Sequence, residues 1–398
     1  MVALPCLRPS LRPRALVTLG WELLAGSTAP EQVSRFTDEV GVYLKRSTVL
    51  FVPSARQGLR LLLRALGLGR HDEVLLPALT YPAVPAVLRE LGITPVFVEL
   101  LPGTLSLDPS RLAAARTART KVVLATHLAG LPHALGDLAD FCSANKLILL
   151  EDCAQAFGAT YDARPVGSFG LAAIFSLATT KAFTALGGGL LVTDEAALGA
   201  ALLESCVGLP RQTRSEALPL LGKAAMLTVA TSSLVFPIVA RGLELGDRLG
   251  IDLVDGLLRE REAGLGRALH LHRPHPAFAG FASRQLGDFP SRLRRRRHVW
   301  HELRDRLHGV PGLGLPALDP RAGFSAASFP VFVEDKRGFR SRLRRSGVDS
   351  SAGFIEAFSD GCPEAQKTLD QLVFLPIYEE LGERELELLV RAVRTALA

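Results

Sequence analysis

One short stretch decides the fold class: Ile148-Leu149-Leu150-Glu151-Asp152-Cys153-Ala154-Gln155. Three apolar residues are followed at once by two carboxylates, which is typical of a buried strand that ends at the edge of a parallel sheet. A carboxylate in that position is poorly solvated and needs a cationic partner. Taken alone, Asp152 fits a helix N-cap as well as a catalytic group.

Short β-rich runs alternate with helical stretches between residues 49 and 194. This alternation predicts an α/β fold with a mostly parallel seven-stranded sheet covered by helices. The expected strands are Val49–Val52, Glu73–Leu76, Pro95–Val98, Lys121–His127, Lys146–Glu151, Ala173–Ser176 and Gly189–Thr193. Ligands in such sheets bind where strands end and loops begin.

A lysine follows one of these strands in Phe175-Ser176-Leu177-Ala178-Thr179-Thr180-Lys181. Only seven of the 46 basic residues are lysines, so a lysine in this loop is unusual. A buried lysine loses its proton readily and can form a Schiff base, which an arginine cannot do. The alternative interpretation is an ordinary surface lysine on a loop.

Two further junctions carry candidate ligand groups at the same edge of the sheet. Ser54 and Ala55 begin a leucine-rich helix, where free backbone N–H groups favour a bound phosphate, although Ser54 also fits a simple helix cap. Tyr81 follows the next strand and fits either stacking on a planar ligand or core packing. A phosphate cradle, an aromatic ring, a carboxylate and a lysine together outline a pyridoxal phosphate site.

Several spaced motifs resemble those of the DegT/DnrJ/EryC1/StrS sugar aminotransferases, a branch of the fold-type I pyridoxal phosphate enzymes. They are Thr126-His127-Leu128-Ala129-Gly130-Leu131-Pro132, Glu151-Asp152-x-Ala154-Gln155-Ala156-x-Gly158-Ala159, Gly167-Ser168-x-Gly170, Phe175-Ser176-x-x-x-x-Lys181, Cys362-Pro363-Glu364-Ala365 and Leu375-Pro376-Ile377. They follow the family's order, and the resemblance covers nearly the whole chain.

The resemblance implies that Lys181 binds pyridoxal 5′-phosphate through a Schiff base and later moves the substrate proton as general acid and base. It places Asp152 against the pyridine nitrogen. It also implies that Gln155 lies near the 3′-oxygen and that Tyr81 stacks on the ring. Ser176, with Ser54 and Ala55, is implied to hold the phosphate. The implied reaction transfers an amino group, usually from L-glutamate, to a nucleotide-linked keto-sugar. The resemblance also implies that the enzyme is a homodimer and that it acts in sugar, polysaccharide or secondary-metabolite biosynthesis.

Three positions depart from the family pattern. Gly187 stands where the family commonly has Glu, and Phe157 stands where many members have His. The family's G-x-N-x-R segment falls at residues 269–273, so Leu271 replaces the Asn that reaches the phosphate across the dimer interface. Candidate replacements for that contact are His270, His272 and Arg56.

The alternation of strands and helices stops after Thr193, and the sequence predicts two domains. Residues 1–265 form the large cofactor-binding domain, with an apolar helical insert near 216–245, and residues 266–398 form a smaller α+β domain. The uncharged stretch Ala224–Ala240 fits a helix in a core or dimer interface, a membrane-surface helix, or a short membrane span. A peripheral membrane contact through 224–240 is therefore one expected interaction.

Two other functions stay open beside the aminotransferase. One is a membrane-associated or regulatory relative that binds the cofactor but lacks standard sugar-nucleotide activity, although intact Lys181, Asp152 and Gln155 count against it. The other is a dehydratase of the same family. Dehydratases of that kind replace the lysine with His, so Lys181 argues against this reaction.

Composition excludes several classes of protein. The 398 residues are 48% hydrophobic and 22% charged, which excludes wholesale disorder and collagen. Five scattered cysteines without a C-x-x-C pair indicate neither a disulfide framework nor a zinc ribbon, and they favour a reducing compartment. The first 14 residues have no apolar core of a secretory signal, so a cytoplasmic location is expected.

The net charge of +6 does not predict nucleic-acid binding, because the arginines are spread over the whole chain. The densest run, Arg292–Arg297, favours a solvated helix face over a phosphate-binding patch. A second stripe, formed by Arg56, Arg60 and Arg64 on one helix, is likewise expected to face solvent rather than an anionic ligand.

Overall fold

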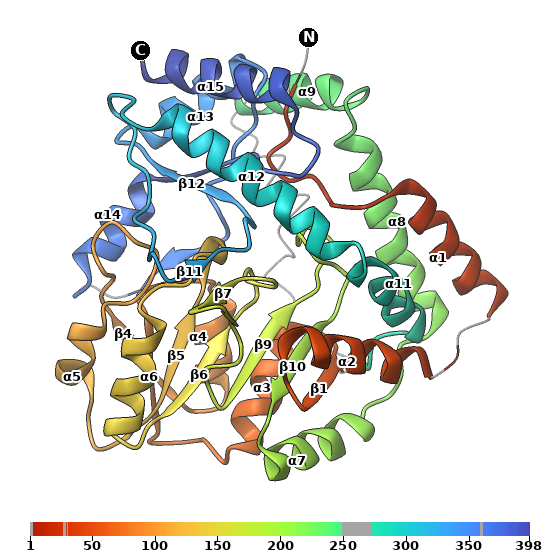
Figure 1. The fold of residues 1–398 in the computed structure, drawn as a ribbon, viewed down its shortest axis with the longest axis vertical. Helices are drawn as coiled ribbons and strands as arrows, with labels where there is room; N and C mark the ends of the chain where they lie inside the picture. The colour runs from red at the N-terminus through yellow and green to blue at the C-terminus, as the bar shows by residue number, and fades with distance from the viewer. Residues whose placement is uncertain (1–2, 27–28, 30, 249–271, 359–360) are drawn as a thin grey trace.

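The computed structural model describes residues 3–26, 29, 31–248, 272–358 and 361–398. Its centre is a seven-stranded sheet in the order β1-β10-β9-β6-β5-β2-β4 (Figure 1). These strands are β1 (Thr48–Val52), β2 (Glu73–Pro77), β4 (Thr94–Val98), β5 (Thr120–Thr126), β6 (Ile148–Asp152), β9 (Ala172–Ser176) and β10 (Gly189–Thr193). Only β10 runs antiparallel to its neighbours, β1 and β9. The predicted strands and the mostly parallel sheet are confirmed.

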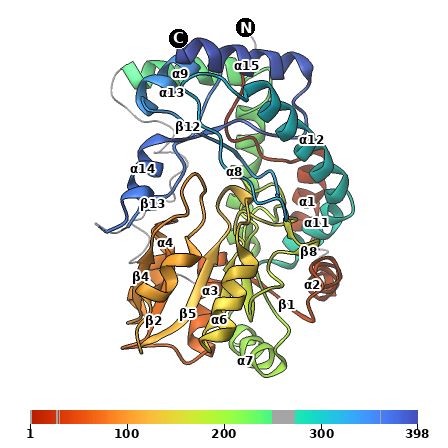
Figure 2. The same cartoon turned by 60° about the vertical axis from the view of Figure 1, so that its left-hand side comes forward.

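Helices cover both faces of this sheet (Figure 2). Leu59, Leu62 and Leu202 belong to the buried cluster on one face, and Phe36 and Phe281 belong to the cluster on the other. The helices of the first face are α3 (Ala55–Ala65), α4 (Ala83–Glu90) and α7 (Ala196–Val207), and those of the second include α2 (Glu31–Leu44), α6 (Leu135–Ala144) and α11 (Pro276–Leu286). Because both faces are buried, the strands are apolar almost throughout.

A second core forms in the C-terminal part of the chain, around the fully buried Trp300 and Phe339. Its elements are α12 (Phe289–Leu307), β12 (Phe329–Phe332), α13 (Lys336–Arg345), α14 (Pro363–Gln371), β14 (Leu372–Leu375) and α15 (Glu383–Leu397). Leu4 joins this core and forms a bridge with Val348, so the N-terminal segment packs on the C-terminal part. The division of the chain at residue 265 stays a prediction.

Short elements complete the described fold. They are β3 (Leu79–Thr80), η1 (Pro109–Arg111), α5 (Leu112–Ala115), η2 (Leu128–Gly130), β7 (Thr160–Tyr161), β8 (Arg164–Pro165), β11 (Ala322–Gly323) and β13 (Glu356–Ala357). The strand β13 pairs antiparallel with β3, which connects the C-terminal part to the edge where Tyr81 lies.

The apolar stretch 224–240 is not one helix, which corrects the sequence-based expectation. It is divided between α8 (Arg214–Ala230) and α9 (Phe236–Arg248). In the turn between them, Thr231 Oγ1 donates to the Leu227 carbonyl at 2.7 Å and Ser232 Oγ donates to the Val229 carbonyl at 2.7 Å. Hydroxyls that bond the backbone in this way compete with helix continuation. Among the helices of the described residues, none is both long enough and apolar enough to cross a membrane.

Helix α8 packs against α1 (Pro13–Ala25) (Figure 1). Both helices expose apolar side chains to solvent. Ala217 and Ala224 of α8 are buried, which agrees with core packing on the inner side. The exposed apolar side chains, which we call the α1–α8 face, are Val17, Trp21, Leu24, Leu218, Met226 and Val229. The apolar stretch therefore contributes both to the core and to the surface.

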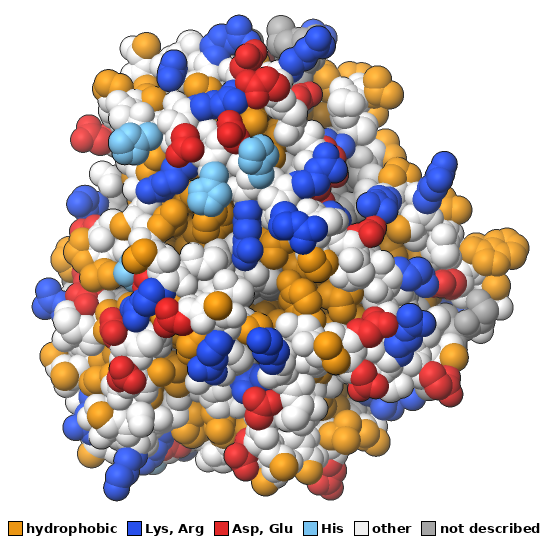
Figure 3. Space-filling view, in the orientation of Figure 1, with side chains coloured by type: hydrophobic (Ala, Val, Ile, Leu, Met, Phe, Trp, Pro, Cys, Tyr) orange, Lys and Arg blue, Asp and Glu red, His pale blue; other side chains and the backbone are white. Residues whose placement is uncertain are grey.

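The arginine run of α12 is only partly solvated, so the expectation of a fully solvated face is wrong. Arg296 is 4% exposed and forms an ion pair with Glu379, and Arg292 does the same. Arg297 donates to the carbonyls of Phe324 and Gly158. Figure 3 shows that basic side chains elsewhere on this face of the molecule are scattered among acidic and apolar ones rather than gathered into one patch.

The stripe on α3 also differs from the expectation. Arg64 is exposed, but Arg60 is buried, donates to Gln57 Oε1 at 2.6 Å and pairs with Glu90. The sequence could not show this pairing, because Glu90 lies on α4, a neighbouring helix.

Candidate active site

Lys181 lies in the loop that connects β9 to β10. Hydroxyls within the loop bind its backbone: Thr179 Oγ1 donates to the Leu186 carbonyl at 3.0 Å, and Thr184 Oγ1 donates to the Leu177 carbonyl at 3.0 Å. Leu186 adopts a positive φ of 62°, a conformation that leucine rarely takes. Side-chain hydrogen bonds therefore stabilise an unusual loop shape around Lys181.

Asp152 ends β6, near the middle of the sheet, and is 5% exposed. Its Oδ1 accepts a hydrogen bond from the Ala154 amide at 3.0 Å, and the positive charge of Lys181 acts on its carboxylate. Burial raises the pKa of Asp152, while the Ala154 amide and Lys181 oppose this rise. Burial also lowers the pKa of Lys181, against the opposing effect of Asp152. Lys181 is half-buried, and burial makes its amine lose a proton more readily than in water.

Glu151, next to Asp152, binds a turn of the protein rather than facing the lysine. Its carboxylate accepts hydrogen bonds from the amides of Gly167, Phe169 and Gly170 at 2.7–2.8 Å, and it contacts His127 Nε2 at 3.2 Å. Successive residues of a strand point to opposite faces of the sheet, which separates the two carboxylates. The sequence predicts that a carboxylate at this edge needs a cationic partner, and His127 is the side chain that contacts Glu151 there.

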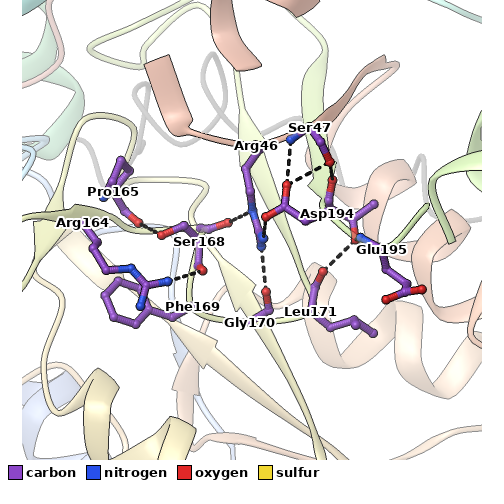
Figure 4. A network of polar contacts seen from close by, with 12 residues as sticks. Arg46, Ser47, Arg164, Pro165, Ser168, Phe169, Gly170, Leu171, Asp194 and Glu195 are labelled. Atoms are coloured by element: carbon purple, nitrogen blue, oxygen red, sulfur yellow. Dashed lines mark hydrogen bonds and ion pairs between the residues drawn. The ribbon is translucent and has the colours of Figure 1, made fainter. Parts of the chain in front are cut away.

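Arg46 binds the same turn from the other side (Figure 4). Its Nε donates to the Gly167 carbonyl at 2.7 Å, its Nη2 donates to the Gly170 carbonyl at 2.7 Å, and its Nη1 pairs with Asp194 at 2.6 Å. A Cβ added to Gly170 would lie 2.6 Å from the Leu149 carbonyl oxygen, so this position requires glycine. The G-S-x-G motif is therefore a turn packed between a carboxylate and a guanidinium.

Replacing Glu151 with Gln is expected to destabilise the fold by about 3 kcal/mol at pH 7, because an amide group would then face the amide N–H donors. Burial raises the pKa of Glu151, but His127, Gly170 and Gly167 outweigh it, so the pKa lies below its usual 4.5. The ionised carboxylate therefore stabilises the fold above about pH 4.5, and this contribution is lost as the pH falls. Denaturant unfolding at pH 7 and at about pH 4 measures the difference.

The exposed Glu195→Gln provides the control, with an expected change within about 0.5 kcal/mol. An equal loss of stability for Glu151→Gln at both pH values would contradict the role of the ionised carboxylate.

A pocket of about 940 Å³, counting its open mouth, contains three of the predicted site residues. Gln155, Ser176 and Lys181 line it. Its other walls come from the N-terminal segment and the C-terminal part, including Cys6, Leu7, Phe354 and Ile377. Polar and apolar side chains both line this pocket, as they do in small-molecule sites.

Ser54 and Ala55 meet Ser176 through Gly189. Ser176 pairs with Gly189 across β9 and β10, and Ser54 forms a bridge with Gly188. A Cβ on Gly189 would lie 2.5 Å from the Ala55 nitrogen and 2.6 Å from the Phe175 carbonyl oxygen. Only glycine permits this close approach of backbones. The Ser54 side chain caps α3 by accepting from the Gln57 amide, so the cap interpretation is confirmed for its hydroxyl.

Tyr81 lies directly after β3 and is 38% exposed, so it is not a core residue. Its hydroxyl accepts a hydrogen bond from Arg56 Nη2 at 3.3 Å. The ring lies outside the lining of the pocket around Lys181, at the same carboxyl edge of the sheet.

The family model of the DegT/DnrJ/EryC1/StrS aminotransferase family matches residues 23–220. This range includes the Asp152 and Lys181 pair and the turn bound by Glu151. The chain belongs to this family.

Relatives with established names support the assignment. The chain is 35% identical over 162 residues to L-glutamine:scyllo-inosose aminotransferase from Streptomyces griseus. That alignment covers 41% of this chain and 38% of the relative, so the chain matches well under half of the relative's length.

Solved structures of aminotransferases share the whole fold. The aminotransferase TlmJ from Streptoalloteichus hindustanus superposes with a TM-score of 0.78 at 21% identity, over 99% of both chains. DesV from S. venezuelae gives a TM-score of 0.74 at 25% identity, over 99% of this chain and 98% of that chain. The chain thus has the fold of the fold-type I aminotransferases.

The residues at this edge fit pyridoxal 5′-phosphate, the cofactor of fold-type I aminotransferases. Thr126 lies beside Asp152 in the register of β5 and β6, and its buried Oγ1 has no hydrogen-bond partner among the described residues. Thr80 Oγ1, next to Tyr81, is also buried and has no hydrogen-bond partner among the described residues. Neither oxygen is accessible from the pocket, so the fit rests on Lys181, Gln155 and Ser176, which line it. Neither threonine was assigned a role from the sequence, although Thr126 belongs to one of the motifs and Thr80 precedes Tyr81.

One departure from the family pattern is accommodated by aromatic packing. Phe157, at the position where many family members have His, stacks on Phe183 at 4.3 Å between ring centroids and on Tyr43 at 5.2 Å. Phe157 and Phe183 both line the pocket, so the wall beside Lys181 is apolar. An apolar wall of this kind is consistent with the lowered pKa of Lys181.

The partner-subunit phosphate contact is not tested. Leu271 and His270 lie outside the described residues. His272 Nδ1 pairs with Glu216 at 2.9 Å, and Arg273 Nε donates to the Leu209 carbonyl at 3.0 Å. Arg273 therefore connects its segment to the loop between α7 and α8.

Proposed function

We propose that this chain is a pyridoxal phosphate-dependent aminotransferase that moves an amino group from L-glutamate to a keto-sugar, in sugar, polysaccharide or secondary-metabolite biosynthesis. The observation that carries the proposal is that Lys181, in the loop after β9, lines a pocket at the carboxyl edge of the sheet, where Asp152 ends the neighbouring strand β6. The name of the S. griseus relative adds L-glutamine as a second candidate donor and an inosose as a candidate acceptor.

Each site residue has a defined task in this proposal. The bound cofactor supplies an electron sink for the reacting carbon. Lys181, whose pKa is lowered by burial, would hold the cofactor covalently and then carry the proton to and from the reacting carbon. Asp152 would keep the pyridine nitrogen protonated. Gln155 would contact the 3′-oxygen and Tyr81 the ring face. Ser176, with the backbone of Ser54 and Ala55, would hold the phosphate.

The proposal is tested by offering the cofactor-loaded protein pairs of donor and acceptor. L-Glutamate and L-glutamine serve as donors, and a nucleotide-linked keto-sugar and a free inosose serve as acceptors. Mass spectrometry of the products detects the amino sugar or aminocyclitol. An aminated product that requires Lys181 supports the function, and the acceptor that reacts identifies the substrate class. A protein that binds the cofactor but aminates no acceptor contradicts it.

We further propose that the protein is a homodimer and that it contacts membranes peripherally through the α1–α8 face. Trp21, Met226 and Val229 are each more than half exposed on this face. The two acidic residues of these helices are engaged, Glu22 with Arg284 and Glu216 with His272. The basic side chains of α1 and α8, which are Arg14, Arg214 and Lys223, favour an anionic lipid surface.

We expect the protein to sediment with vesicles that contain phosphatidylglycerol and to sediment less with phosphatidylcholine vesicles. Trp21→Ser combined with Met226→Ser should reduce binding about tenfold, because the apolar area available to the bilayer falls. The matched control is Val42→Ser, an 83% exposed valine on α2. Point variants are preferable to deletion of 224–240, since Ala224 and Phe236 are buried.

Two results would contradict the membrane contact. One is protein that stays in the supernatant with both kinds of vesicle. The other is a double variant that binds normally but loses its dimer in light scattering, which would assign the face to a second copy of the chain instead.

A further inference from the structure

Arg292, on α12, contacts three segments that are remote from one another in the sequence. Its Nε donates to Glu379 Oε1 at 2.7 Å. Its Nη2 donates to the carbonyl oxygen of Ala182 at 2.9 Å and to that of Ser10 at 3.2 Å. The Arg292 side chain is 12% exposed. Because Ala182 follows Lys181 directly, this guanidinium is bonded to the backbone of the lysine loop.

Glu379 fixes Arg292 in this position. Its Oε2 also accepts hydrogen bonds from Arg296 Nη1 at 2.9 Å and from Ser10 Oγ at 3.0 Å. Burial raises the pKa of Glu379, but the positive charges of Arg296 and Arg292 outweigh it and lower the pKa to about 2. The carboxylate is therefore ionised at neutral pH, and charge-assisted hydrogen bonds of this kind are about twice as strong as neutral ones.

A second side chain binds the lysine loop from a neighbouring helix. Gln285 Nε2, from α11, donates to the Thr184 carbonyl at 2.8 Å. Arg292 and Gln285 thus bind two carbonyls of the same loop, one and three residues after Lys181. The hydroxyls of Thr179 and Thr184 stabilise the loop from within, whereas these two side chains attach it to the surrounding helices.

The segments joined by Arg292 also form walls of the pocket. Leu7 and Ile377 line the pocket, and they are close in sequence to Ser10 and Glu379 respectively. The ion pair therefore connects the lysine loop to both the N-terminal segment and the C-terminal part. Such a connection restricts how far the loop can move away from Asp152 and toward water.

We propose that Arg292, supported by Gln285, is a positioning residue for Lys181. By binding the Ala182 carbonyl from a buried ion pair, Arg292 holds the lysine loop in place and so limits the access of water to the half-buried amine of Lys181. This inference rests on the proposed function, because it assigns Arg292 a role through the lysine that binds the cofactor. Arg292 itself need not touch the cofactor or the substrate.

Arg296 offers a matched control on the same helix. It lies one turn beyond Arg292, is buried to a similar extent and pairs with the same carboxylate. Its other hydrogen bonds go to Ser10 Oγ and to the carbonyls of Ala326, Ala327 and Ile377, which all lie outside the lysine loop. Replacing either arginine with lysine keeps the charge but removes the planar fork of donors. Only the Arg292 variant loses a contact with the lysine loop.

The experiment measures how readily Lys181 of the cofactor-free protein reacts with added pyridoxal 5′-phosphate in the presence of cyanoborohydride, at about pH 6–10. Peptide mass spectrometry quantifies the label on Lys181. In Arg292→Lys we expect the pH profile to move upward by about one unit, which corresponds to about tenfold slower labelling at pH 8, because a looser loop admits water to the amine. In Arg296→Lys we expect a similar loss of Tm with an unmoved profile.

Gln285→Ala keeps the inference testable if Arg292→Lys does not fold. We expect a smaller upward movement of its profile with a Tm near that of the unmodified sequence. If Arg292→Lys and Arg296→Lys give the same pH profile of labelling, the inference is wrong. If Arg292→Lys does not fold, a Gln285→Ala profile equal to that of the unmodified protein would overturn it. A protein of unmodified sequence that is not labelled at Lys181 would instead contradict the proposed function.

Discussion

Replacing Lys181 with Ala is expected to reduce amino-group transfer by about four orders of magnitude. The variant loses both the amine that binds the cofactor covalently and the base that moves the substrate proton. The fold should survive, because the side chain lies at a pocket and carries a half-buried amine whose desolvation is unfavourable. Product formation in the donor and acceptor assay measures the loss, and thermal unfolding shows whether the fold is intact.

Lys367→Ala is the matched control for this variant. Lys367 lies on α14 with 61% of its side chain exposed and pairs only weakly with Glu364 at 3.6 Å. We expect its activity to be unchanged. Retention of more than about one tenth of the activity by Lys181→Ala would contradict the assignment of Lys181.

Replacing Asp152 with Asn is expected to lower the rate of transfer about 10²- to 10⁴-fold without loss of stability. Asn has the same shape and can still accept from the Ala154 amide, but it cannot keep the pyridine nitrogen protonated. Because burial opposes the charge of Asp152, removing that charge does not weaken the fold. Single-turnover rates with L-glutamate, beside Tm values, separate the two effects.

The neighbouring carboxylate should behave in the opposite way. Glu151→Gln loses stability through the turn at residues 167–170, whereas Asp152→Asn loses activity. A rate within about threefold of the unmodified protein for Asp152→Asn would show that Asp152 does not act on the cofactor. A large loss of Tm in Asp152→Asn would place it with Glu151 as a structural residue.

Much of the large sheet could be predicted from the sequence. The strands are covered on both faces, so each appears as a continuous apolar run with a clear start and end. The carboxyl ends of parallel strands lie at one edge, which is why Asp152, Ser176 and the lysine loop could be placed together before the structure was known. The C-terminal elements β14 and α14 were not predicted, because β14 is a buried apolar run of only four residues and α14 is a helix of nine.

Pairings between distant segments could not be predicted. The arginine run of α12 has the composition of a solvated helix, but Glu379 binds two of its members from 83 and 87 residues away. Arg46 and Glu151 bind one turn from two different elements, and nothing local to either residue indicates this. The sequence also could not show which side of α8 is buried, because α8 packs against α1, a helix near the start of the chain.

The most direct test of the central claim is the visible absorption spectrum of the protein with pyridoxal 5′-phosphate, before and after borohydride reduction, followed by addition of L-glutamate or L-glutamine. We expect an absorption band that borohydride removes, a cofactor adduct on the peptide containing Lys181, and loss of the band when an amino donor is added to unreduced protein. A spectrum without such a band, or an adduct on another lysine, would contradict the account that Lys181 and Asp152 form the cofactor site of an aminotransferase.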